Sequence, residues 1–299
     1  MDFRNAKELL KVCQEQGLSI SAVMLQRELT EGEQDPGETD RKMDRVLEIM
    51  KSAASTPIHT PVKSMGGLIG GEAKKISDHK DTGKGLCGDL LERAVIYAMA
   101  TLETNASMGV IVASPTAGSA GIVPGLLLAL QETYNLSDEQ IKPYNLSDEQ
   151  IKQGLYNASA IGYLAMRNAT VAGAVGGCQA EVGIASAMAA SATVELMGGS
   201  PEQSLAAAST VLMNMLGLVC DPVGGLVEYP CQNRNAAGVA NATIAAEIAL
   251  SGVRQLIPFD EMLEAVYTVG KRLPAELRET ALGGCATTPS ACAACHMCD

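Results

Sequence analysis

The stretch Gly176-Gly177-Cys178-Gln179-Ala180-Glu181 places a cysteine directly after two glycines, and the fold is predicted to be organised around this point. Two later cysteines lie in similar contexts: Cys220 precedes Asp221-Pro222, and Cys231 follows Tyr229-Pro230. Glycine and proline interrupt regular structure, so each cysteine is predicted at the end of an element, where separate parts of the chain can meet. Three converging thiolates are a suitable ligand set for iron. Three ligands on a four-iron cube leave one iron open to substrate, as three protein ligands do in catalytic zinc sites.

The spacing of these cysteines does not by itself decide between a metal site and ordinary packing. The intervals of 42 residues (178 to 220) and 11 residues (220 to 231) match no short metal-binding motif. A free cysteine is among the most buried residue types and often packs as a small hydrophobic side chain. Both interpretations stay open on the residues alone.

The composition predicts a helical protein. The chain has 299 residues, enough for one large domain or two small ones. Hydrophobic residues make up 47% of it, yet aromatic residues only 3%, and Trp is absent. Long runs of small side chains favour closely packed helices, and Ala is the best helix former. Because strand signals are few, we predict a mostly α fold, with a helical catalytic domain packed around the cysteine-bearing loops.

The charge and cysteine content restrict partners and location. A net charge of −12 argues against binding to nucleic acid or to an anionic membrane surface, both of which require clustered Lys and Arg. The polar start of the chain lacks the apolar segment of a signal peptide. Nine cysteines are then expected in a reducing compartment, so we predict a cytoplasmic protein. The most apolar stretch, residues 110–130, contains two prolines and is predicted to be core and loop instead of a membrane span.

Three parts are predicted along the chain. Residues 1–54 form a helical segment with an acidic linker, residues 55–284 a helical catalytic domain, and residues 285–299 a cysteine-rich tail. The linker is EGEQDPGET (31–39), and the stretch 55–88 is expected to be loop-rich because of its paired glycines and its prolines. Helices are expected over residues 5–16, 21–29, 40–54, 89–103, 201–218, 234–253, 260–270 and 274–282.

A nine-residue segment is repeated in the middle of the chain. YNLSDEQIK occupies residues 134–142 and again 144–152. Each copy contains an S-x-x-Q capping box, Ser137 with Gln140 and Ser147 with Gln150. The repeat is too short for a structural unit, so we interpret it as a tandem duplication in a connection between two helices.

Three sequence motifs resemble those of a known family. They are NASMGVIVASPTAGSAG (105–121), GGCQAE (176–181) and LGLVCDPVGGLVEYPCQNRNA (216–236). They resemble the α subunit of the iron–sulfur-dependent L-serine dehydratases, over roughly residues 61–289. The resemblance implies that Cys178, Cys220 and Cys231 hold a [4Fe-4S] cluster.

The resemblance also implies an activity: deamination of L-serine to pyruvate and ammonia without pyridoxal phosphate. The open iron would act as a Lewis acid on the β-hydroxyl group, as in aconitase. A base would remove the α-proton, and the resulting aminoacrylate would hydrolyse. The sequence does not reveal this base, and a partner chain is a candidate to supply it.

Substrate-binding residues are expected on two glycine-rich loops and at the start of a late helix. Proline, glycine and small hydroxyl residues before a helix leave free N–H groups that suit a carboxylate; ordinary helix capping is the alternative. The residues assigned to substrate are Lys63, Ser64, Asn105, Ser107, Thr116, Gly118, Ser119 and Arg234.

The tail is expected to cap the open iron. It contains Cys285, Cys292, Cys295 and Cys298 after the pair Gly283-Gly284. In single-chain relatives a C-terminal cysteine serves as a displaceable fourth ligand, and Cys292 matches it by position. The tail sequence also allows three other interpretations: the c-type haem pattern Cys292-x-x-Cys295-His296, part of a ferredoxin run, and a disordered terminus.

Single-chain relatives also carry an additional α/β region that this chain lacks, so a separate β subunit is expected. Two alternative functions stay open. One is desulfuration of cysteine at the same iron. The other is a non-catalytic metal-binding or electron-transfer protein that uses the tail cysteines.

Overall fold

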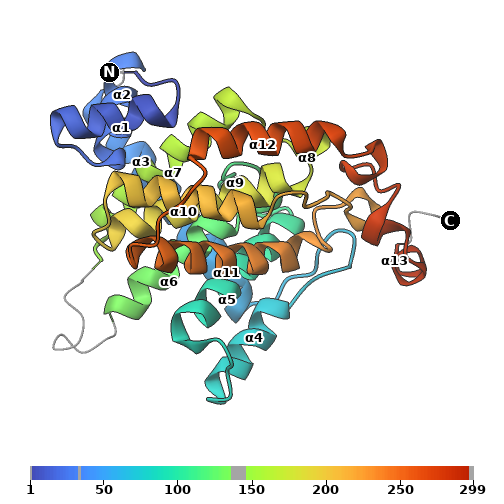
Figure 1. Cartoon of the computed structure of the whole chain (residues 1–299). Helices are drawn as coiled ribbons and strands as arrows, with labels where there is room; N and C mark the ends of the chain where they lie inside the picture. Colours follow the sequence, from blue (N-terminus) through green and yellow to red (C-terminus); the bar gives the residue numbers. More distant parts are fainter. Residues whose placement is uncertain (1, 33–34, 136–145, 296–299) are drawn as a thin grey trace.

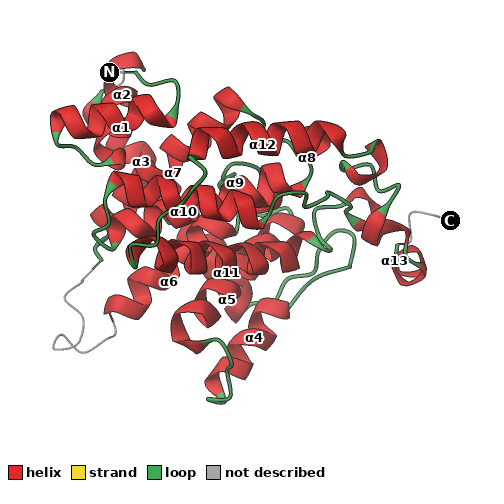
Figure 2. Cartoon of the chain, in the orientation of Figure 1, coloured by secondary structure: helices red, strands yellow, loops and turns green. Residues whose placement is uncertain are grey.

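The computed structural model describes residues 2–32, 35–135 and 146–295. Within these ranges the regular structure is helical, which confirms the predicted mostly α fold (Figure 2). The α-helices are α1 Ala6–Gln16, α2 Ile20–Glu31, α3 Pro36–His59, α4 Glu72–Asp81, α5 Gly88–Ala106, α6 Ile122–Asn135, α7 Asp148–Asn168, α8 Gly173–Gly176, α9 Cys178–Leu196, α10 Pro201–Asn214, α11 Cys231–Leu250, α12 Phe259–Arg272 and α13 Pro289–Ala294. The 3-10 turns are η1 Ala117–Ser119, η2 Val223–Gly225, η3 Ala275–Leu277 and η4 Gly284–Thr287.

Helix α9 lies at the centre of the bundle, with α6, α7, α10 and α11 packed around it (Figure 1). Its small and apolar residues are spread around all faces and nearly all are buried, as expected of a helix enclosed by other helices. Small residues let the neighbours approach closely: a Cβ on Gly238 of α11 would lie 2.7 Å from Ser186 Oγ of α9. The position of Cys178, the first residue of α9, is therefore set by the packing of the whole bundle.

The N-terminal segment packs onto this same core. Phe3, Leu9, Ile20 and Leu47 belong to one continuous set of buried side chains with those of α9. Helices α1 and α2 follow the predicted ranges closely. Helix α3 starts earlier than predicted, because Asp35 accepts the Glu38 N–H as N-cap and Pro36 suits the first helical position. The second half of the expected linker is therefore helical, while the three-part division of the chain stays a prediction.

Two other expectations along the chain need correction. The stretch 55–88 is loop-rich as expected, but α3 continues to His59 and an unexpected helix, α4, occupies Glu72–Asp81. Helix α4 escaped prediction because it is polar and buries only Ala73, so it shows little hydrophobic periodicity. A helix over 274–282 is replaced by the short turn η3, and the chain then takes a left-handed conformation at Glu279 (φ 64°) and Ala281 (φ 57°).

The second copy of the repeated segment starts a helix as predicted. Ser147 and Gln150 form a complete capping box at the start of α7. The box expected at Ser137 and Gln140 lies outside the described residues. In the described part of the chain no helix is both long and apolar enough to cross a membrane.

Candidate active site

Two of the three cysteines begin helices, as predicted from their glycine and proline neighbours, and the third lies in a loop. Cys178 opens α9 after Gly177, whose φ of 75° allows the sharp entry into the helix. Cys231 opens α11 after Pro230, and Cys220 lies in the loop between α10 and η2. All three side chains are buried. The free N–H groups of a helix N-terminus favour a thiolate, so two of the three positions suit metal-ligand chemistry.

Cys178 and Cys220 meet a carboxylate that the sequence analysis left without a role. One ligand atom each of Cys178, Cys220 and Glu181 lies within 4.8 Å of the other two. The Cys220 Sγ is 3.7 Å from Glu181 Oε2. Gly173 leaves room beside this group, because a Cβ there would lie 2.4 Å from Glu181 Oε2 and 3.1 Å from Cys220 Sγ. Cys231 is not part of this closest group.

The three thiols have different proton affinities. The pKa of Cys178 is lowered, first by a hydrogen bond from the Cys220 thiol and further by the Arg234 guanidinium. The same hydrogen bond, with burial, raises the pKa of Cys220. Burial raises the pKa of Cys231 to about 12, and the charge of Cys178 adds to this effect. Cys178 is therefore the readiest of the three to ionise, and a metal bound by all three thiolates would have to displace the protons of the other two.

Arg234 joins the three cysteine-bearing segments. It lies one turn after Cys231 on α11. Its Nη1 is 3.5 Å from Cys178 Sγ and 3.0 Å from the carbonyl oxygen of Val219. Its Nη2 forms an ion pair with Asp221 Oδ1 at 2.7 Å. Arg234 was expected to bind substrate, and these contacts also make it a brace between the segments that carry the three cysteines.

The loop 114–121 reaches the cysteines through Glu181. Thr116 Oγ1 donates to Glu181 Oε1 at 2.8 Å, and Ser119 Oγ lies 3.1 Å from Thr116 Oγ1. Burial raises the pKa of the Glu181 carboxyl group. Gly118 packs beside the same carboxylate, since a Cβ there would lie 3.4 Å from Glu181 Oε1. The structure thus brings three of the expected substrate residues close to the cluster formed by Cys178, Cys220 and Glu181.

Asn235 is a second residue that the sequence analysis missed. Its Nδ2 donates to the Gly118 carbonyl oxygen (2.8 Å) and to that of Cys231 (2.9 Å), and its Oδ1 accepts the Gly121 N–H. It therefore locks the loop 114–121 to the start of α11. Glu181 and Asn235 both belong to the sequence motifs that resemble the family. A single sequence does not show which polar residue of such a motif faces the site.

Four expected substrate residues lie apart from the cysteines, on the loop 63–69 and at the C-terminal end of α5. Ser64 Oγ donates to Glu228 Oε2 at 2.7 Å, and Lys63 beside it is exposed. Ser107 Oγ donates to the Thr104 carbonyl oxygen at the end of α5, where Asn105 also lies. The Met65 N–H donates to the Ala106 carbonyl oxygen, which joins these two segments. None of the four makes a hydrogen bond to a cysteine within the described residues.

The tail docks on the loop that follows Cys220. The Cys285 N–H donates to Asp221 Oδ2 at 2.6 Å. Gly284 (φ 62°) permits this contact, because a Cβ there would lie 2.2 Å from the same oxygen. In Figure 1 the tail helix α13 and the N-terminal helices lie at opposite ends of the molecule.

The tail thiols differ in their surroundings. Cys292 is exposed, and its Sγ lies 3.7 Å from the Ala286 carbonyl oxygen. Cys295 is buried against Gly224, where a Cβ would lie 2.7 Å from its Sγ. Cys298 and His296 lie outside the described residues. The assignment of Cys292 as cap stays a prediction. Among the described tail residues, Cys285 contacts the loop between Cys220 and Cys231 at Asp221, and Cys295 contacts it at Gly224.

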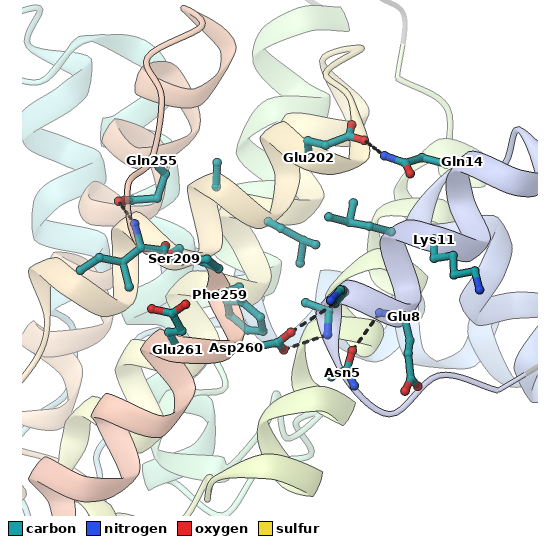
Figure 3. Close-up of a pocket in the computed structure, with 17 residues that line it drawn as sticks. Asn5, Glu8, Lys11, Gln14, Glu202, Ser209, Gln255, Phe259, Asp260 and Glu261 are labelled. Atoms are coloured by element: carbon teal, nitrogen blue, oxygen red, sulfur yellow. Dashed lines mark hydrogen bonds between the residues drawn. The ribbon is translucent and has the colours of Figure 1, made fainter.

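A groove of about 1030 Å³ lies elsewhere, between α1, α10 and the start of α12 (Figure 3). Asp260 accepts the Ala6 and Lys7 N–H groups at the start of α1, and Gln14 donates to Glu202 across the groove. Its lining mixes acidic and basic side chains and includes no cysteine. Its polar contacts are those that attach α1 to the bundle, so we assign no chemistry to it.

Comparison with known proteins identifies the family. The sequence model of the family described as "Serine dehydratase alpha chain" matches residues 15–286. The chain belongs to this family. It is 47% identical over 288 residues to the "Probable L-serine dehydratase, alpha chain" of Bacillus subtilis, covering 96% of this chain and 92% of the relative. It is 44% identical over 284 residues to the "L-serine dehydratase, alpha chain" of Peptoniphilus asaccharolyticus, covering 95% and 94%.

A longer relative shows that this chain spans only part of some family proteins. The "L-serine dehydratase" of Helicobacter pylori is 34% identical over 296 residues, which is 96% of this chain but 62% of the relative. The family match confirms the resemblance predicted from the sequence motifs. It includes Cys178, Cys220, Cys231 and both groups of loops, and it ends just before Cys292.

Proposed function

We propose that this chain is the catalytic subunit of an L-serine dehydratase, a lyase that converts L-serine to pyruvate and ammonia. Family membership and the names of two relatives at 47% and 44% identity support this. The observation that carries the proposal is that Cys178, Cys220 and Thr116 lie around one carboxylate, that of Glu181, which hydrogen-bonds to the last two. Cysteines able to hold a metal and the loop 114–121, which suits an amino-acid carboxylate, therefore share one site.

Cys178, Cys220 and Cys231 would hold a [4Fe-4S] cluster. The donor set fits: three buried thiols from separate segments, two of them at helix N-termini, with space left by Gly173. When bound, the cluster supplies Lewis acidity that eases departure of the substrate hydroxyl group. No pyridoxal phosphate is needed.

The chain's own residues bind and orient the substrate. In this proposal the loop that carries Thr116, Gly118 and Ser119 holds the substrate carboxylate, and Asn235 keeps this loop against α11. Arg234 braces the cysteine segments and adds positive charge to the site. We infer that the segments that carry Lys63, Ser64, Asn105 and Ser107 form the side of the substrate site opposite the loop 114–121.

A second subunit completes the enzyme in this proposal. The two relatives called "alpha chain" match over 92% and 94% of their length, whereas the Helicobacter pylori protein matches over only 62% of its length. We therefore infer that a separate β subunit supplies the remainder. The tail, attached at Cys285 to Asp221, would supply the displaceable thiolate, and a cytoplasmic location would keep these thiols reduced.

The test is anaerobic reconstitution of the chain, alone and co-expressed with its second subunit. We expect about four iron and four sulfide per chain and pyruvate only when L-serine is added. Cys178→Ser, Cys220→Ser and Cys231→Ser should each lose the iron absorbance, whereas Cys87→Ser, at an exposed position away from the site, should keep it. Full iron in all three variants would contradict the ligand set.

Two other results would replace the proposed activity. Sulfide release from L-cysteine without pyruvate formation from L-serine would indicate a desulfidase. A loaded cluster with neither product would indicate a non-catalytic iron–sulfur protein.

A further inference from the structure

Glu228 is a buried carboxylate that holds a loop from a distant part of the chain. Its side chain is 2% exposed. One oxygen, Oε1, accepts the Gly66 N–H at 2.7 Å. The other, Oε2, accepts the Ser64 hydroxyl at 2.7 Å and the Leu68 N–H at 3.0 Å. Three donors from one short loop thus converge on one carboxylate, which has no ion-pair partner among the described residues.

The loop 64–69 is shaped as a cradle for this carboxylate. It is closed at its base, because the Ser64 N–H donates to the Ile69 carbonyl oxygen and the Ile69 N–H donates to Ser64 Oγ. Gly66 allows the close approach: a Cβ there would lie 2.3 Å from Leu226 Cδ1 and 2.9 Å from Glu228 Oε1. Backbone N–H groups that converge in a turn form an anion-binding concavity, and here the anion belongs to the protein itself.

The segment 226–228 is also in contact with the second substrate loop. A Cβ on Gly118 would lie 3.6 Å from Val227 Cγ1 and 3.4 Å from Glu181 Oε1. Val227 therefore borders the loop that reaches the cysteines, while its neighbours Leu226 and Glu228 border the loop 64–69. The segment 226–228 is a spacer between the two groups of loops assigned to substrate.

We propose that Glu228 is a positioning residue that fixes the loop 64–69 at a set distance from the loop 114–121, and that this distance sets the affinity for substrate. The proposal rests on the proposed function, because it takes the two loops as opposite sides of the substrate site. It also revises the role of Ser64: its hydroxyl is engaged by Glu228, so Ser64 shapes the loop instead of binding the substrate carboxylate.

A carboxylate is required at this position because all three groups around it are donors. In Glu228→Gln the side-chain NH₂ group must face one of these donors, so at least one hydrogen bond is lost while the volume is kept. The loop 64–69 is then released from the spacer. Since the cysteines keep their own contacts, the substrate affinity should change without loss of the cluster.

The experiment compares Glu228→Gln and Gly66→Ala with the unmutated enzyme, each reconstituted with iron and sulfide. Gly66→Ala leaves the carboxylate intact but places a Cβ 2.3 Å from Leu226 Cδ1 and 2.9 Å from Glu228 Oε1, so the present fit of the loop against these side chains is lost. We expect KM for L-serine to rise about tenfold or more in both, with kcat within about threefold, the pattern of lost binding. Iron content should be unchanged. Trypsin should cleave after the exposed Lys63 faster than in the unmutated protein, in the presence and absence of the cluster.

Glu195→Gln is the matched control. Glu195 Oε2 also accepts two hydrogen bonds, from Asn157 Nδ2 and the Ser21 N–H, but it lies at the far end of α9 from Cys178. This variant should leave KM and the cleavage after Lys63 unchanged.

The proposal is overturned if both variants keep KM within about twofold of the unmutated enzyme, or if cleavage after Lys63 is not accelerated. Loss of iron together with the rise in KM would also overturn it, because Glu228 would then act on Cys231. If the unmutated enzyme makes no pyruvate, the proposed function fails, and the cleavage rates still report separately whether Glu228 holds the loop.

Discussion

Replacement of Arg234 by Gln should strongly destabilise the metal-free protein. The Arg234 side chain is 15% exposed and that of its partner Asp221 only 3%, so water screens their 2.7 Å ion pair little. Removing one member of a buried pair leaves an uncompensated charge, which costs about 3–5 kcal/mol. Because Asp221 Oδ2 keeps the Cys285 N–H, we expect the lower end of that range. This is a large share of the roughly 5–15 kcal/mol that stabilises a typical protein.

The assay is urea unfolding followed by far-ultraviolet circular dichroism, in reducing buffer with a chelator so that no metal contributes. Arg93→Gln is the matched control. Arg93 is 19% exposed and pairs with Asp89 and Glu132 at 2.8 Å, but these carboxylates are 46% and 39% exposed. Its loss should cost no more than about 1 kcal/mol per pair. The double variant with Asp221→Asn should recover part of the Arg234→Gln loss, since no buried charge is then left unpaired.

A cost for Arg234→Gln of less than about 1 kcal/mol, equal to that of the control, would refute this reasoning. It would mean that Asp221 is solvated or protonated without its partner. The brace between the three cysteine segments would then contribute nothing before metal binds.

Three further predictions concern the tail, the repeat and the pH dependence of stability. Cys292→Ala should remove a lag in pyruvate formation if that thiol caps the site; removal of the lag by Cys295→Ala alone would assign the cap to the tail thiol buried against Gly224. Deletion of residues 134–143 should leave folding near normal, because doubling a loop costs only about 0.6 kcal/mol; a fall in Tm of about 10 °C would show that the insert is packed. Burial raises the pKa of Cys13 to about 12 from 9.0, so the unfolded chain loses this proton first. The free energy by which the protonated Cys13 thiol stabilises the fold is therefore fully present below pH 9. It is lost as the pH rises toward 12, by about 1.4 kcal/mol per pH unit. In Cys13→Ala the free energy of unfolding, measured with urea, should fall less steeply over that range, and an unchanged slope would contradict this.

The sequence by itself determined the fold class and the family. Small apolar residues, abundant Ala and few strand signals predicted close-packed helices, and the central helix α9 shows why: its neighbours approach to distances that only small side chains allow. The glycine and proline neighbours of Cys178, Cys220 and Cys231 predicted that each lies at the end of an element. Such local signals depend on backbone conformation, which a few neighbouring residues set.

Only the tertiary structure decided which polar residues meet. Glu181 and Cys220 are separated by 39 positions, and Glu228 and Ser64 by 164, yet each pair is in contact. Helix α4 was missed for a related reason, since its stability comes from packing of a short polar helix against α5 instead of from its own periodicity. Contacts of this kind depend on the packing of whole helices, and no pattern along a single chain records which side chains that packing turns toward one another.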